Sequence, residues 1–119
     1  MSPLLFLAAA LAGGVGAVLR YLVDLGVARF VGRRFPWGIL IVNLTGSFAL
    51  GLVTTALPGA AFVLGAGLLG GYTTFSTAML DAVALWRDGE RGAAAFDALG
   101  MLLLGLLAAG LGLALGSAL

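Results

Sequence analysis

Residues 67–78 combine flexible backbone with polar side chains in the middle of a long apolar segment, and they are the first candidates for chemistry. Their sequence is Gly-Leu-Leu-Gly-Gly-Tyr-Thr-Thr-Phe-Ser-Thr-Ala. Glycine costs about 1 kcal/mol relative to alanine inside a helix, and β-branched threonine loses side-chain freedom there. A membrane helix containing this segment is therefore expected to break at its centre. The carbonyl and N–H groups that such a break frees are suited to binding ions.

The same glycines permit a second interpretation, in which they serve packing alone. Small residues spaced along a membrane helix let a neighbouring helix approach closely. The residues by themselves leave the ion-binding and the packing interpretations open.

Asn43 and Arg20 are two further polar residues within apolar segments. An unsatisfied polar group in hydrocarbon is costly, so Asn43 is expected either to bond a neighbouring helix or to direct its N–H donors into a pore. Arg20 lies near the end of the first apolar segment. It is expected either to anchor that helix at the membrane surface or to hold an anion-attracting or structural position at a pore mouth.

The composition determines the class of protein that must position these residues. The chain has 119 residues, of which 62% are hydrophobic and 9% charged, and its mean hydropathy is +1.19. Soluble domains carry about 25% charged residues, and a membrane span needs about 20 apolar residues. The sequence predicts an all-α membrane protein whose four transmembrane helices, the third broken at its centre, form one domain over residues 1–119. The expected spans are 4–23, 37–57, 60–86 and 95–119, with a short interfacial helix in the first loop.

Several classes of function are disfavoured. Cysteine and histidine are absent, which removes the usual zinc sites and Cys- or His-based catalysis, so the chain is not expected to be an enzyme. A net charge of +1 without a basic run gives no reason to expect a nucleic-acid partner. A small proton-coupled multidrug transporter is the alternative function, but it needs a carboxylate embedded in the membrane. The acidic residues all fall near span ends or in loops: Asp24, Asp81, Asp88, Glu90 and Asp97.

The basic residues are distributed on one side only. All six flank the first or the third loop, which share one side of a four-span protein: Arg20, Arg29, Arg33, Arg34, Arg87 and Arg91. Because loops rich in Lys and Arg stay in the cytoplasm, both termini are expected outside the cell.

Three segments, taken together and in order, resemble the Fluc (CrcB) family of fluoride channels over essentially the whole chain. They are residues 13–21, residues 36–48 followed by Gly51, and residues 67–77. The resemblance implies a passive fluoride-selective channel in the inner (plasma) membrane that exports cytoplasmic fluoride. It also implies an antiparallel dimer with pores along the subunit interface.

A structural sodium ion on the dimer axis is part of this resemblance. The matching motif assigns its backbone ligands to Gly70 and Thr73. Four carbonyl oxygens, two from each subunit, suit a hard cation.

The fluoride pathway is likewise assigned by motif. The Asn43 amide supplies N–H donors, and the Phe75 ring presents its positive edge to the anion. A narrow pore lined with such groups replaces the water that fluoride holds tightly. The pathway is also expected to include Thr74, Ser76 and Thr77.

The chain departs from the family pattern where pore-lining groups are usual. The departures are Ile39, Ala78, Ala98 and Met101, at positions where the family usually has Thr, Phe, Tyr and Ser respectively. Together with the one-sided arginines, they favour one subunit of a heterodimer in which one pore has decayed. A divergent antiparallel homodimer and a non-conducting structural subunit are the alternatives.

Overall fold

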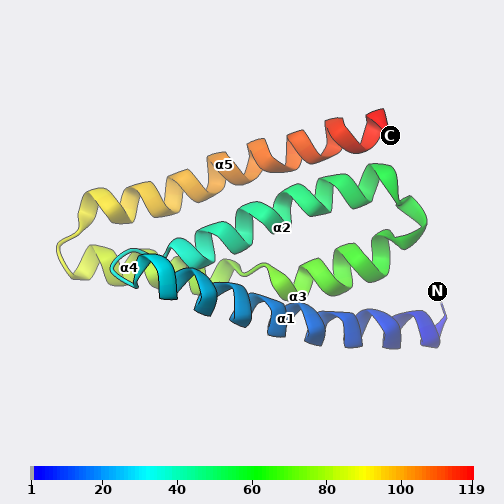
Figure 1. Ribbon diagram of the computed structural model, residues 1–119, viewed down its shortest axis with the longest axis horizontal. Coiled ribbons are helices and arrows are strands. Elements are labelled where there is room, and N and C mark those ends of the chain that lie inside the picture. Colours follow the sequence, from blue (N-terminus) through cyan, green and yellow to red (C-terminus); the bar gives the residue numbers. More distant parts are fainter. Residues whose placement is uncertain (1) are drawn as a thin grey trace.

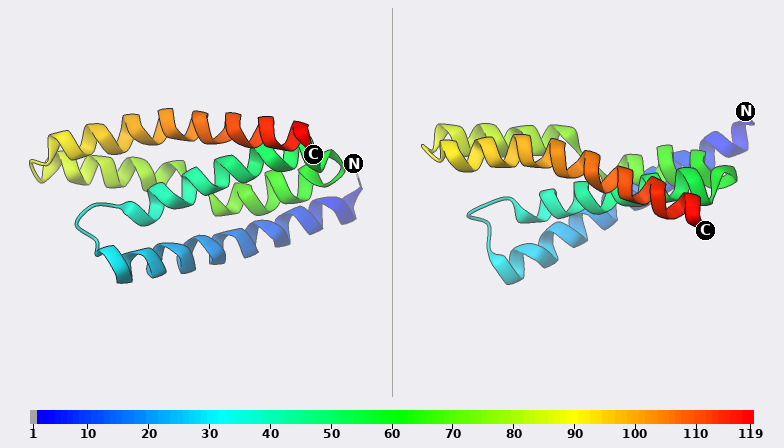
Figure 2. Two further views of the ribbon diagram at one scale, coloured as in Figure 1. Left: turned by 45° about the horizontal axis from the view of Figure 1, so that its top comes forward. Right: turned by 90° about the horizontal axis from the view of Figure 1, so that it is seen from above.

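The computed structural model describes residues 2–119, which form an elongated bundle of antiparallel helical segments. Both termini lie at one end of the bundle, and the loops at 32–36 and 88–90 lie at the other (Figures 1 and 2). No strand occurs among the described residues. The segments are α1 (Pro3–Val31), α2 (Trp37–Ala56), η1 (Pro58–Ala60), η2 (Ala61–Leu69), α3 (Gly70–Tyr72), α4 (Phe75–Arg87) and α5 (Arg91–Ala118).

Four helical stretches are long and apolar enough to cross a membrane: Pro3–Val31, Trp37–Ala56, Pro58–Arg87 and Arg91–Ala118. The bundle is 49 Å long, which exceeds the roughly 30 Å of a bilayer's hydrocarbon core, so the helix ends reach the headgroup region. Most large apolar side chains are exposed, as expected when lipid is the solvent. The predicted all-α architecture with four spans is confirmed.

The helix α2 occupies the centre of the bundle and packs along α5 (Figure 1). Glycines at matching heights bring the two backbones together. A Cβ atom added at Gly51 would overlap the Ala109 carbonyl, and one added at Gly112 would overlap the Phe48 carbonyl. This close approach holds α5 against the residues of α2 that build the site.

The helix α1 packs against the first half of the third span, and glycines again make the contact. A Cβ at Gly71 would overlap the backbone of Gly13, and one at Gly67 would stand 2.8 Å from the Ala9 carbonyl oxygen. The packing interpretation therefore holds for these glycines. Gly70 differs, because the nearest atom to an added Cβ is the Gly65 carbonyl oxygen at 3.7 Å.

The third span changes backbone geometry along its length. In η2 the hydrogen bonding is π-helical, and the Gly70 N–H reaches the Gly65 carbonyl five residues earlier. Thr73 (φ −77°, ψ 156°) and Thr74 (φ −147°, ψ 123°) are extended. The helix α4 then begins at Phe75. Two extended residues thus separate α3 from α4 in the middle of the apolar stretch 58–87.

The expectation of a separate interfacial helix in the first loop was wrong. The helix α1 continues past residue 23 to Val31 and ends at Gly32, whose φ of +77° favours glycine. Its N–H bonds the Ala28 carbonyl at 2.8 Å. Apolar residues continue at helical spacing through Val27 and Phe30, and no proline interrupts them.

Candidate functional site

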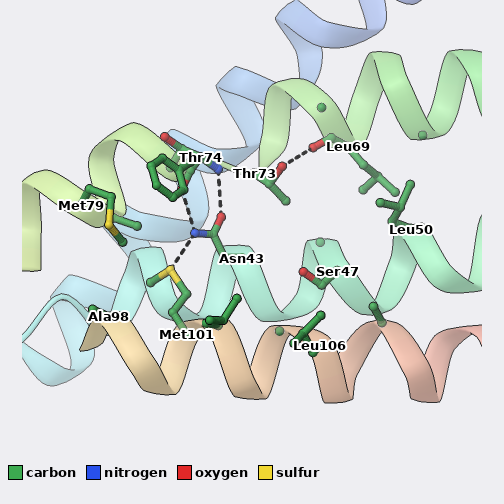
Figure 3. A pocket seen from close by; sticks show the side chains of 18 residues that line it. Asn43, Ser47, Leu50, Leu69, Thr73, Thr74, Met79, Ala98, Met101 and Leu106 are labelled. Atoms are coloured by element: carbon green, nitrogen blue, oxygen red, sulfur yellow. Dashed lines mark hydrogen bonds between the residues drawn. The ribbon is translucent and has the colours of Figure 1, made fainter. Parts of the chain in front are cut away.

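An open groove of about 440 Å³ crosses the face of α2, between the third span and α5 (Figure 3). Among the predicted site residues, Asn43, Gly70, Thr73, Thr74 and Phe75 line it. The rest of the lining is mostly apolar and includes three of the positions that depart from the family pattern: Ala78, Ala98 and Met101.

Both polar atoms of the Asn43 side chain have hydrogen-bond partners within the groove (Figure 3). Its Oδ1 accepts the Thr74 N–H at 2.8 Å, and its Nδ2 donates to the Thr74 carbonyl at 2.8 Å. Nδ2 also lies 3.0 Å from the Sδ atom of Met101 on α5, in position to donate to it. Of the two roles expected for Asn43, the structure shows the bond between helices.

Phe75 is 77% exposed and is the first residue of α4. Thr74 is the N-cap of this helix, and its hydroxyl oxygen accepts the Thr77 N–H at 3.2 Å. The ring therefore stands at the positive end of a helix dipole and on the surface of the groove. The helix N-terminus favours a negative charge nearby.

Arg20 reaches the site from the other side. It extends from α1, and its Nη1 donates to the Thr73 carbonyl at 3.3 Å without lining the groove. This contact ties α1 to the extended backbone at residues 73–74. The position of Arg20 at a pore mouth stays a prediction.

The structure separates Ser76 and Thr77 from the other predicted residues. Neither lines the groove, and Ser76 is exposed. Thr77 instead lines a second cavity of about 210 Å³ near the 32–36 loop. Charged residues share this cavity, which holds Asp24, Arg33 and Asp81, and the Arg33 Nη1 lies 3.4 Å from the Asp24 Oδ2.

Asp97 is a feature that the sequence analysis missed. It was placed near a span end, yet it is only 1% exposed, and neither carboxylate oxygen has a hydrogen-bond partner within residues 2–119. Asp97 lies three residues after the buried Ala94 and four before Met101, which puts it on the inward face of α5. This helical spacing is the sequence pattern from which its burial could have been predicted. A carboxylate is thus embedded in the bundle, and the positional argument against a proton-coupled transporter does not hold for this residue.

Asp97→Asn is expected to raise the free energy of unfolding by about 1–3 kcal/mol, because it removes a carboxylate that is buried without a hydrogen-bond partner among residues 2–119. Thermal unfolding of the purified protein measures the effect. Asp88→Asn is the matched control, since Asp88 is exposed at the end of α4, and no change is expected there. A loss of stability in Asp97→Asn alone would show that the carboxylate has a favourable partner.

Comparisons with known proteins identify the protein family to which this chain is similar. A family profile described as "CrcB-like protein, Camphor Resistance (CrcB)" matches residues 7–113. The protein named fluoride-specific ion channel FluC 1 of Leifsonia xyli is 49% identical over 98% of this chain and 89% of its own length. The fluoride-specific ion channel FluC of Thermus thermophilus is 45% identical over 96% of this chain and 94% of its own.

These relatives are named as ion channels, which confirms the expectation that the chain is not an enzyme. With four helices able to span a bilayer, the chain is a multi-pass membrane protein. The match covers nearly all of the bundle, including α2, the third span and the groove between them. The chain therefore belongs to the CrcB family, as its three motif segments predicted.

Proposed function

We propose that this chain is a subunit of a passive, fluoride-selective channel that exports cytoplasmic fluoride across the inner membrane. The observation that carries the proposal is the shared groove of Asn43 and Phe75, which brings an amide donor and an exposed ring from separate helices to one surface. Relatives that cover nearly the whole chain are named for fluoride, and this supports the choice of anion.

The chemistry of the groove suits a small anion. One Asn43 N–H is held by the Thr74 carbonyl, a strong acceptor, and the other by the Met101 sulfur, which is a weak one. The second N–H is therefore the one offered to fluoride. The Phe75 ring edge adds a positive partner, and the Thr74 hydroxyl, which accepts a bond from Thr77, keeps its own hydrogen free to donate.

Ser76 and Thr77 have a less direct place in this proposal. Ser76 is exposed one residue after Phe75, where a second subunit could bring it beside the ion path. Thr77 lines the cavity at the loop end of the bundle. Its hydroxyl is proposed to act there, at the cytoplasmic entrance of the pathway.

The groove is proposed to be covered by an oppositely oriented second subunit. It lies open on the surface of the single chain and is lined largely by apolar groups. An antiparallel partner would enclose two such grooves and turn each into a narrow path, which is what exclusion of larger anions requires. The partner is either a second copy or a homologous chain.

A sodium ion on the axis of this dimer is proposed to hold the two copies together. The Gly70 and Thr73 residues line the groove, and the Thr74 N–H that a continuous helix would give to the Gly70 carbonyl goes to Asn43 instead. No group of three or more His, Cys, Asp or Glu side chains within residues 2–119 could hold a metal. Backbone carbonyls, two from each subunit, are oxygen ligands of the kind that a hard cation takes.

Fluoride efflux from proteoliposomes tests the proposed function. Vesicles loaded with fluoride are expected to release it passively, and chloride release is expected to stay at the level of protein-free vesicles. Chloride release as fast as that of fluoride, or fluoride release that requires a proton gradient, would contradict a fluoride channel. Release only after reconstitution with an oppositely oriented homologue would support the heterodimer. Absence of fluoride release in both experiments would favour a structural subunit that does not conduct. The loss of pore-lining groups at Ala78 and Met101 supports that alternative.

A single orientation is also expected, because the arginines of the loop regions all lie at one end of the bundle. In cells, Ser2→Cys should react with an impermeant thiol reagent from outside, and Asp88→Cys should react only after the cytoplasm is opened. No native cysteine interferes with the labelling. In the 88–90 loop, Asp88 is a better site for the cysteine than its neighbour Gly89, because the φ of +83° at Gly89 disfavours any residue with a side chain. Equal labelling of both sites from both sides would instead show dual topology, which permits an antiparallel homodimer and contradicts the single orientation.

A further inference from the structure

The Asn43 side chain does more than present a donor to the groove, because it forms hydrogen bonds with both the N–H and the carbonyl of Thr74. The Thr74 N–H donates to Oδ1, and Nδ2 donates to the Thr74 carbonyl, each at 2.8 Å (Figure 3). The two residues are 31 positions apart, on α2 and at the extended part of the third span. Such a two-point contact fixes the position and the direction of this peptide segment.

The helical hydrogen-bond register shows what Asn43 replaces. The Thr73 N–H still bonds the Leu69 carbonyl at 2.9 Å, four residues earlier, and its hydroxyl reinforces the same acceptor at 2.9 Å. In a continuous helix the next N–H, that of Thr74, would bond the Gly70 carbonyl. Asn43 takes this N–H instead. The helical register is therefore lost at the residue that Asn43 holds, and Gly70 is the first carbonyl without its helical donor.

The Thr73 carbonyl also lacks its helical donor, because that N–H bonds a different side chain. The Thr77 N–H, which would bond it in a continuous helix, bonds the Thr74 hydroxyl instead. Its remaining contact is the Arg20 guanidinium at 3.3 Å, and a carbonyl oxygen has two lone pairs. One lone pair at Thr73 is thus available for another partner. The two carbonyls proposed as sodium ligands are the two whose helical donors have been diverted by side chains.

We infer that Asn43 is a positioning residue for the cation site: its Oδ1 keeps the Thr74 N–H away from the Gly70 carbonyl and so keeps that carbonyl free for the ion. The inference rests on the proposed sodium site. It gives Asn43 two separable functions, because Oδ1 acts on the third span whereas the Nδ2 hydrogen near Met101 acts in the anion pathway. Removing the oxygen and removing the donors should therefore have different consequences.

The experiment measures how sodium changes the thermal unfolding temperature of the purified dimer. Wild-type protein is expected to unfold at a higher temperature in sodium than in N-methylglucamine, since sodium binds the folded state. Asn43→Leu keeps the size of the side chain but cannot accept the Thr74 N–H, so the sodium-dependent rise is expected to disappear. Asn43→Asp keeps an oxygen acceptor for the Thr74 N–H and, when its carboxyl is protonated, a donor for the Thr74 carbonyl, so it is expected to retain the rise at acidic pH. Its fluoride efflux should fall because no N–H is left for the anion.

Thr54→Val is the matched control on α2, because within the described part of the chain the Thr54 hydroxyl bonds the Leu50 carbonyl of its own helix and no other group. It should leave the sodium-dependent rise unchanged. Size-exclusion elution and helical content show whether each variant is folded and dimeric.

The outcomes separate this inference from the sodium site itself. A full sodium-dependent rise in a folded Asn43→Leu dimer would overturn the role of Asn43 and leave the sodium site standing. If Asn43→Leu does not fold, Asn43→Asp at acidic pH decides: loss of the rise in a folded Asn43→Asp dimer, with the rise retained by wild type at the same pH, would overturn the inference as well. Absence of the rise in wild-type protein would overturn both the sodium site and the role assigned to Asn43.

Discussion

Gly16→Ala is expected to lower the free energy of unfolding by about 1–3 kcal/mol, and by more if the helices cannot separate. A Cβ atom at this position would overlap the Leu68 carbonyl oxygen and stand 2.8 Å from the Tyr72 backbone nitrogen. Both are backbone atoms of the third span, which cannot turn aside as the end of a side chain can. The only relief is to move α1 away from the third span immediately before Thr73, which Arg20 contacts.

The control for this substitution lies two residues earlier on the same helix. A Cβ atom at Gly14 would meet no atom outside its own helix within 4 Å among residues 2–119. Because alanine is favoured over glycine in a helix by about 1 kcal/mol, Gly14→Ala should be neutral or stabilising. Thermal unfolding of the two variants gives the comparison. Equal stabilities would show that α1 does not depend on this close approach for its position.

The sequence was sufficient to predict the features that depend on composition and local chemistry. Four apolar stretches in 119 residues leave room for one arrangement of spans, and this arrangement is the one observed. The two residues that the structure shows as extended, Thr73 and Thr74, lie within the segment singled out for poor helix-forming tendency. Asn43 was expected either to bond a neighbouring helix or to direct its donors into a pore, because an amide in an apolar environment requires partners, and the structure shows its bond to the Thr74 backbone.

Other features depend on tertiary contacts and could not be predicted in this way. The residues of the Gly-rich segment look alike in the sequence, yet Gly71 packs against α1 while Gly70 faces the groove, and only the rotation of the helix decides between them. The burial of Asp97 likewise depends on the contact of α5 with its neighbours. Nothing in the sequence indicated the π-helical geometry of η2, and nothing in the structure explains why it extends from Ala61 to Leu69.

In the proposed anion pathway, the contact between Asn43 and Met101 is expected to slow conduction, because the sulfur competes with the anion for the Asn43 amide. The Met101 sulfur lies 3.0 Å from Nδ2, where the anion would have to bind. It is a weak acceptor on a flexible side chain, so an anion can displace it, but it provides no hydroxyl donor in return. The family's usual serine would free the amide and add a donor at the same place.

Ala78 lies where the structure leaves little room for a larger side chain. It lies at the groove but is only 1% exposed, so a phenylalanine ring there has to enter space that neighbouring side chains occupy. Ala78→Phe alone is therefore expected to destabilise the protein by about 1–3 kcal/mol without a gain in fluoride efflux. Met101→Ser removes volume from the lining of the same groove, and the two substitutions are expected to be tolerated better together than apart.

The double variant Ala78→Phe, Met101→Ser is expected to raise fluoride efflux about tenfold over wild type when the purified chain is reconstituted alone, because insertion in the cell no longer fixes its orientation there and an antiparallel homodimer can form. The added ring edge and hydroxyl donor are worth about 1 kcal/mol each, and part of this is lost to repacking. Met101→Leu is the control for the sulfur, since it frees the Asn43 amide without adding a donor or removing much volume, and only a small increase is expected. Efflux and thermal unfolding must be measured on the same preparations. A folded double variant that releases fluoride no faster than wild type would show that the groups lost at these positions do not limit conduction.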